Sequence, residues 1–138
     1  MSGATLPEWF LGIAAHGLPA HLGMEILELT ESRVVATMPV DARTQQPFGI
    51  LHGGASIALA ETVASLGATA RIDRERFVAV GQEINGNHLR GKRDGVVRAT
   101  AVPVHTGRSS QVWSIEIVDE DGKLVCISRC TMAIVERR

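Results

Sequence analysis

The spacing of apolar residues changes along the chain and divides it into helical and extended segments. Between Gly53 and Ala70, apolar residues recur every three or four positions, which predicts one long helix over 53–70. Further apolar residues beside this stripe indicate that the helix is buried on most of its circumference. A shorter apolar stretch with Pro7 near its start predicts a short helix over 7–15.

Elsewhere the apolar repeat falls toward two residues, which is typical of half-buried strands. The segments with this alternation predict six strands, over residues 24–29, 33–40, 77–89, 96–105, 109–118 and 123–135. Gly17, Pro19 and Gly23 predict a loop before the first strand, and residues 119–122 predict a hairpin turn. The predicted order is therefore a short helix, two strands, a long helix and four strands.

This order predicts an α+β fold in which an antiparallel sheet of about six strands curls around one long helix. We expect a single domain over residues 1–138, because no repeat, linker or low-complexity tract interrupts the pattern. One helix covers only one face of such a sheet. The other face and the sheet edges need partners, which favours a homo-oligomer.

Composition and charge exclude several classes of protein. The formal net charge is −1, so no overall field favours nucleic acid or a membrane surface as a partner. No stretch reaches the ~18 apolar residues of a membrane span, and the N-terminus lacks the basic start of a secretory signal. We therefore expect a cytoplasmic protein. Cys126 and Cys130 lie too far apart on one strand for a disulfide, and no residue cluster has metal-ligand spacing, so we expect neither a metal nor another cofactor.

The start of the long helix has an unusual sequence. Gly53 and Gly54 open it, and they remove side chains that would block the approach of a ligand. Ile50 and Leu51 cannot accept a hydrogen bond, and His52 is a poor cap. Free N–H groups at such a start suit an oxygen with partial negative charge. A start satisfied by water or by a neighbouring loop is the alternative.

Glu61 is the only charged residue between His52 and Arg71. A carboxylate on a mostly buried helix is costly unless it is paired or functional, and a solvated stripe or a partner arginine are the alternatives. Gly53 and Glu61 lie ~12 Å apart along the helix axis. One carbonyl group therefore cannot meet both on the same helix. Two helices that run antiparallel across a twofold axis bring them together, which is our hypothesis.

The segment from Gln46 to Glu61 reads QPFGILHGGASIALAE. This pattern resembles the hot-dog thioesterases that hydrolyse aromatic acyl-CoA esters, especially the 1,4-dihydroxy-2-naphthoyl-CoA and 4-hydroxybenzoyl-CoA types. Shorter matches extend the resemblance over nearly the whole chain, with MPVD at 38–41, EIN at 83–85, NHLR at 87–90 and QVW at 111–113. The resemblance implies a hot-dog fold, an acyl-CoA substrate and a homotetramer.

The resemblance also implies a role for individual residues. Glu61 is expected to act as general base or nucleophile, and the Gly53 N–H to polarise the thioester carbonyl. Gln46 and His52 are expected to assist at the carbonyl and acyl end, and Ser65 to help place the carboxylate or the water. The implied substrate- and CoA-binding residues are Gly81, His88, Arg90, His105, Gly107, Arg108, Ser109 and Ser110. Two solvated basic loops are the alternative for the CoA-binding segments.

Three activities remain open at this point. A non-catalytic acyl-CoA-binding module needs no carboxylate at the carbonyl, whereas a hydrolase does. A hot-dog dehydratase or hydratase calls for an Asp/His acid–base pair, which we cannot place in the sequence. Thioester hydrolysis is therefore the leading interpretation. The acyl group itself stays open between an aromatic and a medium aliphatic one, because apolar pockets discriminate poorly.

Overall fold

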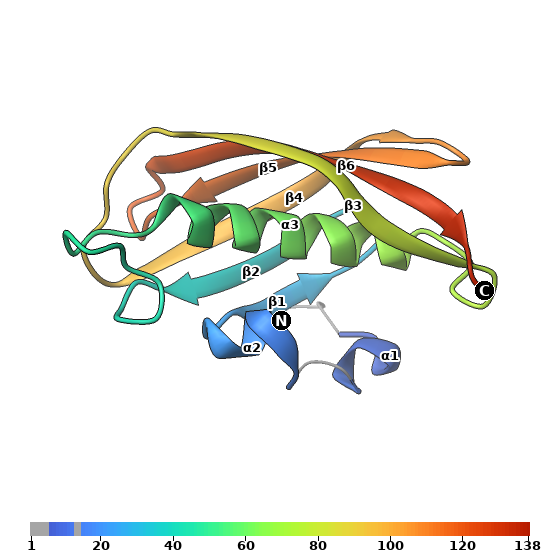
Figure 1. Ribbon diagram of the computed structural model, residues 1–138, viewed down its shortest axis with the longest axis horizontal. Helices are drawn as coiled ribbons and strands as arrows, with labels where there is room; N and C mark the ends of the chain where they lie inside the picture. Colours follow the sequence, from blue (N-terminus) through green and yellow to red (C-terminus); the bar gives the residue numbers. More distant parts are fainter. Residues whose placement is uncertain (1–5, 13–14) are drawn as a thin grey trace.

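The sheet curls around one long helix, which lies on its concave side (Figure 1). The structure is a computed structural model that describes residues 6–12 and 15–138. Its helices are α1 (Glu8–Leu11), α2 (Gly17–His21) and α3 (Gly53–Ala70), and its strands are β1 (Glu25–Leu29), β2 (Val34–Pro39), β3 (Phe77–His88), β4 (Val96–Thr106), β5 (Ser110–Val118) and β6 (Leu124–Glu136). All strand pairs are antiparallel, in the order β1-β2-β4-β5-β6-β3. The predicted hot-dog architecture is confirmed.

The core lies between α3 and the concave face of the sheet. The face of α3 that is turned to the sheet carries mostly small residues, namely Ala55, Ser56, Leu59, Ala60, Val63, Ala64, Gly67 and Ala68. They let the helix approach closely, since a Cβ on Gly67 would lie 2.5 Å from the Trp113 ring. Trp113, Ile115 and Ile117 alternate along β5 and are fully buried, as the pattern predicts. Gln111 accepts the Trp113 indole N–H at 2.8 Å, so this buried donor is satisfied.

The N-terminal segment differs from the prediction. A loop is predicted at Gly17, Pro19 and Gly23, but the chain forms helix α2 there. Pro19 lies in the first turn of α2, where its missing N–H removes no hydrogen bond. The helix predicted over 7–15 is shorter than expected, because α1 ends at Leu11. Positions 13 and 14 of that prediction lie outside the described residues.

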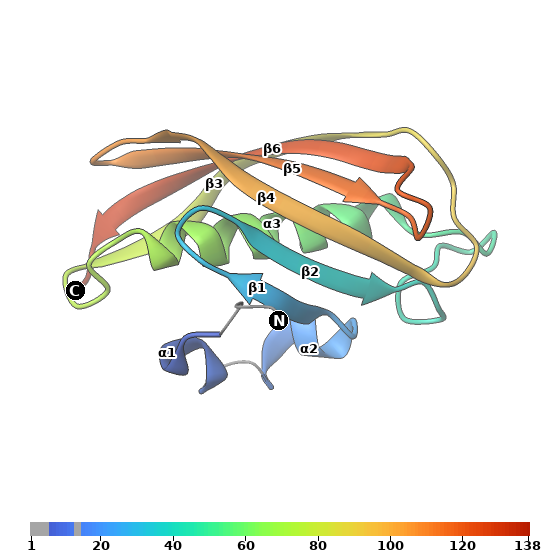
Figure 2. The same cartoon turned by 180° about the vertical axis from the view of Figure 1, so that it is seen from behind.

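Helices α1 and α2 lie beside the edge strand β1, as the views from both sides show (Figures 1 and 2). Phe10 is the buried residue of α1 and belongs to the main hydrophobic core. The Arg74 guanidinium lies 4.6 Å from the centroid of the Trp9 ring, a distance typical of a cation–π contact. These contacts attach α1 to the main core and to the turn that follows α3.

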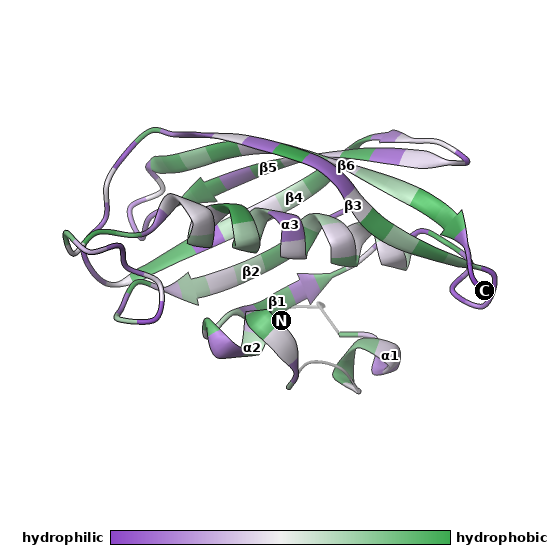
Figure 3. Cartoon of the chain, viewed as in Figure 1, coloured by the Kyte–Doolittle hydropathy of each residue, from purple (hydrophilic) through white to green (hydrophobic). Residues whose placement is uncertain are grey.

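The opposite edge of the sheet is polar and open. Strand β3 pairs with β6 on one side only, and hydrophilic residues colour its middle (Figure 3). The outward face of α3 beside it is half-buried, with Ile57, Ala58, Glu61, Thr62, Ser65 and Leu66. None of the three described helices combines the length and apolar character needed to cross a membrane.

Candidate active site

The start of α3 is capped by the residue that precedes it. The Gly54 N–H donates to His52 Nδ1 at 2.7 Å, and the Ala55 N–H donates to the His52 carbonyl oxygen at 3.0 Å. The expectation of a start without a side-chain cap is therefore wrong. Among the described contacts, the Gly53 N–H has no hydrogen-bond partner. The positive end of the helix dipole adds to the ability of this one N–H group to bind an oxygen.

A recess of about 390 Å³ opens beside Gly53, and we call it the helix-start recess. Its lining residues are Gln46, Ile50, Leu51, Gly53, Ser56, His88, Leu89, Arg90, Gly91 and Val125. His88 lies directly against the helix start, because a Cβ on Gly53 would lie 2.7 Å from His88 Nε2. The structure thus brings four of the expected site residues together: Gln46, Gly53, His88 and Arg90.

Gln46 holds the loop before α3 in shape. Its side-chain Oε1 accepts hydrogen bonds from the backbone N–H groups of Phe48 and Ile50. Its backbone N–H donates to the Ile50 carbonyl oxygen at 2.8 Å. This leaves its amide NH₂ as the group that it can offer to a ligand in the recess. The Phe48 side chain projects from the same loop and is 84% exposed, so a large apolar surface is uncovered beside the recess.

An ionic contact fixes the loop between β3 and β4. Lys92 Nζ lies 2.6 Å from Glu120 Oε1, and the Val96 N–H donates to Glu120 Oε2 at 2.9 Å. The hydrogen bond from Lys92, followed by the one from Val96, lowers the pKa of Glu120 to about 2. The Lys92 carbonyl oxygen in turn accepts the Leu51 N–H at 2.7 Å. The contact between Lys92 and Glu120 therefore supports the segment that leads into His52.

Glu61 lies at the middle of α3, half-buried on its outward face. It lines a second, shallower recess of about 420 Å³, the glutamate recess, with Leu18, Pro19, Ala58, Thr62, Ser65 and Leu66. Its carboxylate packs against β3, since a Cβ on Gly81 would overlap Glu61 Oε2. The register of β3 shifts between Gly81 and Glu83, as at a β-bulge, which re-aims the strand locally. Gly81, expected to bind substrate, thus provides the space that the Glu61 carboxylate occupies.

The side chains beneath Glu61 are a hydroxyl and two sulfur groups. Ser65 Oγ lies 3.8 Å from Met132 Sδ, and Cys130 Sγ lies 3.6 Å from the same sulfur. Burial raises the pKa of the Cys130 thiol to about 11, and the charges of Glu61 and Glu83 add to this shift. Because the thiolate is the reactive form of cysteine, this shift and the complete burial of the side chain disfavour Cys130 as a nucleophile.

The remaining expected residues lie on the hairpin between β4 and β5. The Gly107 N–H donates to the Ser110 carbonyl oxygen at 2.8 Å, and the Ile134 N–H donates to Ser109 at 2.9 Å. The His105 ring folds over Gly107, where a Cβ would lie 2.7 Å from its Nε2. This hairpin, which includes Arg108, lies at the opposite end of the molecule from the helix-start recess (Figure 1). The two basic segments are the one with His88 and Arg90 and the hairpin with His105 and Arg108. One copy of the chain therefore does not bring them together.

Two of these features escaped the sequence reasoning. The contact between Lys92 and Glu120 has no local signal, because it depends on two connections that meet at one end of the sheet. The contact between Gly81 and Glu61 has a weak signal, since a glycine inside a strand often marks a close approach of another group. The sequence identified both residues as site candidates but did not show that they touch.

Comparison with known proteins agrees with the fold and identifies the family. Residues 48–126 match the Thioesterase superfamily. The chain is 56% identical over 122 residues to Bacillus subtilis ComA2, named as a candidate esterase, with 88% of this chain and 97% of that protein covered. It is 51% identical over 115 residues to the 1,4-dihydroxy-2-naphthoyl-CoA hydrolase of Escherichia coli, with 83% and 79% covered. A crystal structure of a mutant of the thioesterase PA1618 from Pseudomonas aeruginosa matches with a TM-score of 0.90 at 40% identity, over 98% of both chains. The chain belongs to the Thioesterase superfamily and is a thioester hydrolase.

We predict that Glu120→Gln lowers the melting temperature at neutral pH, because a neutral amide loses the ionic contact with Lys92. The folded state holds the pKa of Glu120 below its usual value. The contact therefore stabilises fully above about pH 5 and progressively less as the pH falls toward about 2. Thermal unfolding of the wild type and the variant, followed from neutral pH down to about pH 2, measures the difference between their melting temperatures. This difference should be constant above about pH 5 and disappear as the pH falls toward about 2. Asp121→Asn in the same turn is the control, and a pH-independent gap contradicts the assignment.

Proposed function

We propose that the protein hydrolyses acyl-CoA thioesters with an aromatic acyl group, at a site assembled from two copies of the chain. The observation that carries this proposal is the separation of the two reactive groups on α3. Gly53 is the first residue of the helix, and Glu61 follows eight residues later, which places them ~12 Å apart along the axis. A carbonyl group that accepts the Gly53 N–H therefore lies out of reach of Glu61 in the same copy.

The surface around Glu61 supports a second copy as the missing partner. The open edge of β3, the half-buried outward face of α3 and the exposed Phe48 ring lie uncovered in one copy. A second copy that packs antiparallel against α3 and β3 covers all three features, because a twofold interface uses the same patch on both subunits. The same arrangement places the Gly53 N–H of one copy opposite Glu61 of the other, and it forms two equivalent sites.

The chemistry of thioester hydrolysis matches these groups. When water or a carboxylate adds to the carbonyl carbon, negative charge develops on the carbonyl oxygen, and the Gly53 N–H stabilises it. One such donor is typically worth ~3 kcal/mol of barrier. Glu61 takes the proton of the attacking water or attacks the carbonyl directly. When water attacks, Glu61 passes the proton of the water to the CoA sulfur as the C–S bond breaks, which releases the acid and the thiol. When Glu61 attacks, breaking of the C–S bond leaves an acyl–Glu61 anhydride and the CoA thiolate, and water then hydrolyses the anhydride and protonates the thiolate. Both routes consume only water, so the reaction needs no cofactor.

The remaining site residues receive roles that fit their positions. The Gln46 amide in the helix-start recess supports a role at the carbonyl oxygen. His52 caps the helix through its Nδ1, which accepts the Gly54 N–H, and its ring is exposed at the helix start, which supports the expected role at the carbonyl and acyl end. Ser65, one turn after Glu61, supports the placement of the carboxylate or the attacking water.

The CoA portion is proposed to bind between the two basic segments. His88 and Arg90 lie at the helix-start recess, and the hairpin with His105, Arg108 and Ser110 lies at the other end of the same copy. An antiparallel partner brings its hairpin to the end that holds the recess. The two segments then face one ligand, and their positive charges suit the phosphates of CoA.

The named relatives support the proposed acyl group, and the exposed apolar surface supports the proposed assembly. The E. coli relative is named for an aromatic acyl-CoA substrate, which supports an aromatic acyl group here. A dimer is the smallest assembly that completes the site. Apolar residues on the outside of the sheet, including Val102, Val104 and Ile127, are exposed and support a tetramer of two such dimers. The two free cysteines support a reducing, cytoplasmic location.

Mixing experiments test the shared site. We predict that Glu61→Gln and Gln46→Ala each lower kcat strongly, and that subunit exchange between them restores about a quarter of wild-type activity, because half of the dimers are hybrids with one intact site. The matched control mixes Glu61→Gln with Glu61→Ala, which disable the same half of the site and should show no rescue. Equal activity before and after exchange of the first pair contradicts a site built from two subunits.

We also predict that Gly81→Ala lowers kcat by roughly 10- to 100-fold, because the added methyl group displaces the Glu61 carboxylate and small misplacements of a catalytic group are costly. KM for the thioester should change little. Val80→Ala, at the next position of the same strand, is the control for general effects on β3. If Gly81→Ala changes KM and leaves kcat intact, Gly81 contacts the substrate and does not position Glu61.

Replacement of Arg90 or Arg108 by alanine tests the CoA site. We predict about a tenfold rise in KM for an acyl-CoA with kcat nearly unchanged, because these residues bind the part of the substrate that does not react. A truncated N-acetylcysteamine thioester lacks the nucleotide phosphates, so both variants should hydrolyse it like the wild type. A normal KM for the acyl-CoA in both variants removes these residues from the site.

A further inference from the structure

The loop that carries Gln46 is held by the connection between β3 and β4. This loop folds back on itself, since Gln45 and Leu51 form a β-bridge. The Leu51 N–H donates to the Lys92 carbonyl oxygen at 2.7 Å, and the Gln45 side-chain amide donates to the Arg93 carbonyl oxygen at 2.8 Å. Two consecutive carbonyl groups therefore hold both arms of the loop. Gln46 directly follows the first arm, and α3 begins just after the second.

The connection between β3 and β4 has little structure of its own. Residues 89–95 form neither helix nor strand. Among the described contacts, the backbone N–H groups of residues 90–95 make no hydrogen bond to other backbone groups. A segment of this kind opens at low cost unless side chains fix it. The positions of the Lys92 and Arg93 carbonyl groups therefore depend on what holds the connection in place.

The Glu120 carboxylate holds both ends of the segment 92–96. Its two oxygens contact Lys92 Nζ at 2.6 Å and the Val96 N–H at 2.9 Å. Gly95 has a φ of +81°, and a Cβ there would overlap Glu120 Oε2, so this glycine leaves the room that the carboxylate occupies. The turn that carries Glu120 is itself fixed, because Asp119 Oδ1 accepts two backbone N–H groups within it. The carboxylate therefore joins a fixed turn to a connection that lacks internal support.

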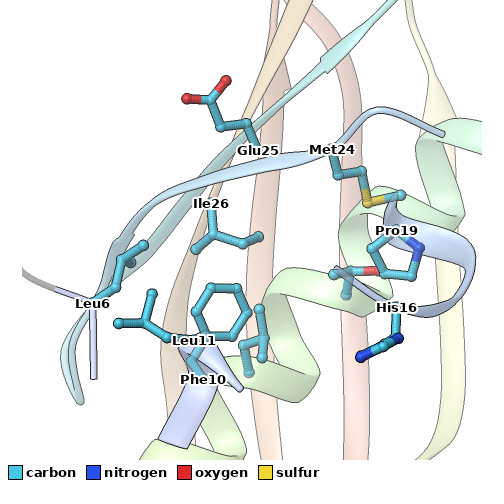
Figure 4. A pocket seen from close by; sticks show the side chains of 10 residues that line it. Leu6, Phe10, Leu11, His16, Pro19, Met24, Glu25 and Ile26 are labelled. Carbon is cyan, nitrogen blue, oxygen red and sulfur yellow. The ribbon is translucent and has the colours of Figure 1, made fainter. Parts of the chain in front are cut away.

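Neither Lys92 nor Glu120 lines a recess at the candidate active site. In the parts of the chain that the structure describes, other residues line the helix-start recess, the glutamate recess and a third cavity between α1, α2, β1 and α3 (Figure 4). The Lys92 side chain is only 13% exposed, and its ammonium group is engaged with Glu120. Lys92 is therefore not a free charge for a phosphate group. Any effect of this pair on hydrolysis passes through the residues that it holds.

We propose that Glu120 is a positioning residue for thioester hydrolysis. Through Lys92 it fixes the connection between β3 and β4, and this connection holds Gln46 and the start of α3 in place at the thioester carbonyl. The proposal rests on the proposed function, because it takes Gln46 and the Gly53 N–H as the groups at the carbonyl oxygen. Loss of the Glu120 carboxylate therefore slows the chemical step for every thioester, whatever its thiol portion.

The test compares Glu120→Gln with the wild type on benzoyl-CoA and on the benzoyl thioester of N-acetylcysteamine, well below the melting temperature of both proteins. The variant should lose roughly tenfold in kcat/KM on both esters, because small misplacements of catalytic groups are costly. On benzoyl-CoA the loss should lie in kcat, with KM changed less than about twofold. Lys92→Met should behave like Glu120→Gln, whereas Lys92→Arg retains the charge and should retain most of the activity.

Glu28→Gln is the matched control, because it removes a comparable ionic contact elsewhere. Glu28 Oε1 lies 2.8 Å from Arg33 Nη2, beside the turn between β1 and β2. Arg71, at the end of α3, donates to the Glu31 carbonyl oxygen in that turn, so the contact lies far from the helix start. Glu28→Gln should leave kcat within about twofold even where it lowers the melting temperature.

Amide hydrogen exchange measures the proposed loosening directly. Exchange of residues 45–51 should quicken at least about threefold in Glu120→Gln, because their anchoring carbonyl groups are no longer fixed. The same residues should exchange in Glu28→Gln as they do in the wild type. Lys92→Met provides the same comparison if Glu120→Gln does not fold.

Three results would overturn the positioning role while hydrolysis stands. The first is a loss confined to benzoyl-CoA, which assigns the pair to CoA binding. The second is an equal loss in Glu120→Gln and Glu28→Gln, which indicates general destabilisation. The third is wild-type kcat or unchanged exchange of residues 45–51 in Glu120→Gln. If the wild type releases thiol from neither ester, the proposed function fails, and the positioning role fails with it.

Discussion

The rigid spacing of two groups along one helix is the constraint on which this structure depends. An α-helix fixes the rise per residue, so the Gly53 N–H and the Glu61 carboxylate cannot approach each other within one copy. The sheet that curls around α3 buries one face of the helix and leaves the face with Glu61 half-buried. The proposed second copy is the simplest way to bring the two groups to one carbonyl. The open edge of β3 and the uncovered face of α3 lie where that copy is needed.

Close contacts at glycines connect the fold to the site. Gly53 leaves room for the His88 ring, and Gly81 leaves room for the Glu61 carboxylate. In each case the side chain comes from a different element than the glycine, so the contact joins α3 to β3. The contact of Lys92 with Glu120 adds a third tie at the same end as the helix start. The placement of the reactive groups therefore depends on contacts that span the fold and not on α3 alone.

Much of the fold could be predicted from the sequence, because its periodicity is strong. The bounds of α3 agree with the prediction, since Gly53 and Arg71 delimit an uninterrupted apolar stripe. The helix at Gly17–His21 was missed because glycine and proline indicate a loop when the tertiary contacts of the segment are unknown. The cap by His52 was missed because cap preferences are averages, whereas one imidazole with suitable geometry accepts the Gly54 N–H.

The most direct test of the shared site is a crystal structure of the Glu61→Gln variant with an uncleaved acyl-CoA bound. The account predicts that the thioester oxygen accepts the Gly53 N–H of one subunit while the side chain at position 61 of the other subunit faces the carbonyl carbon. If both groups come from the same chain, or if the side chain at position 61 faces bulk solvent far from any subunit boundary, the account is contradicted.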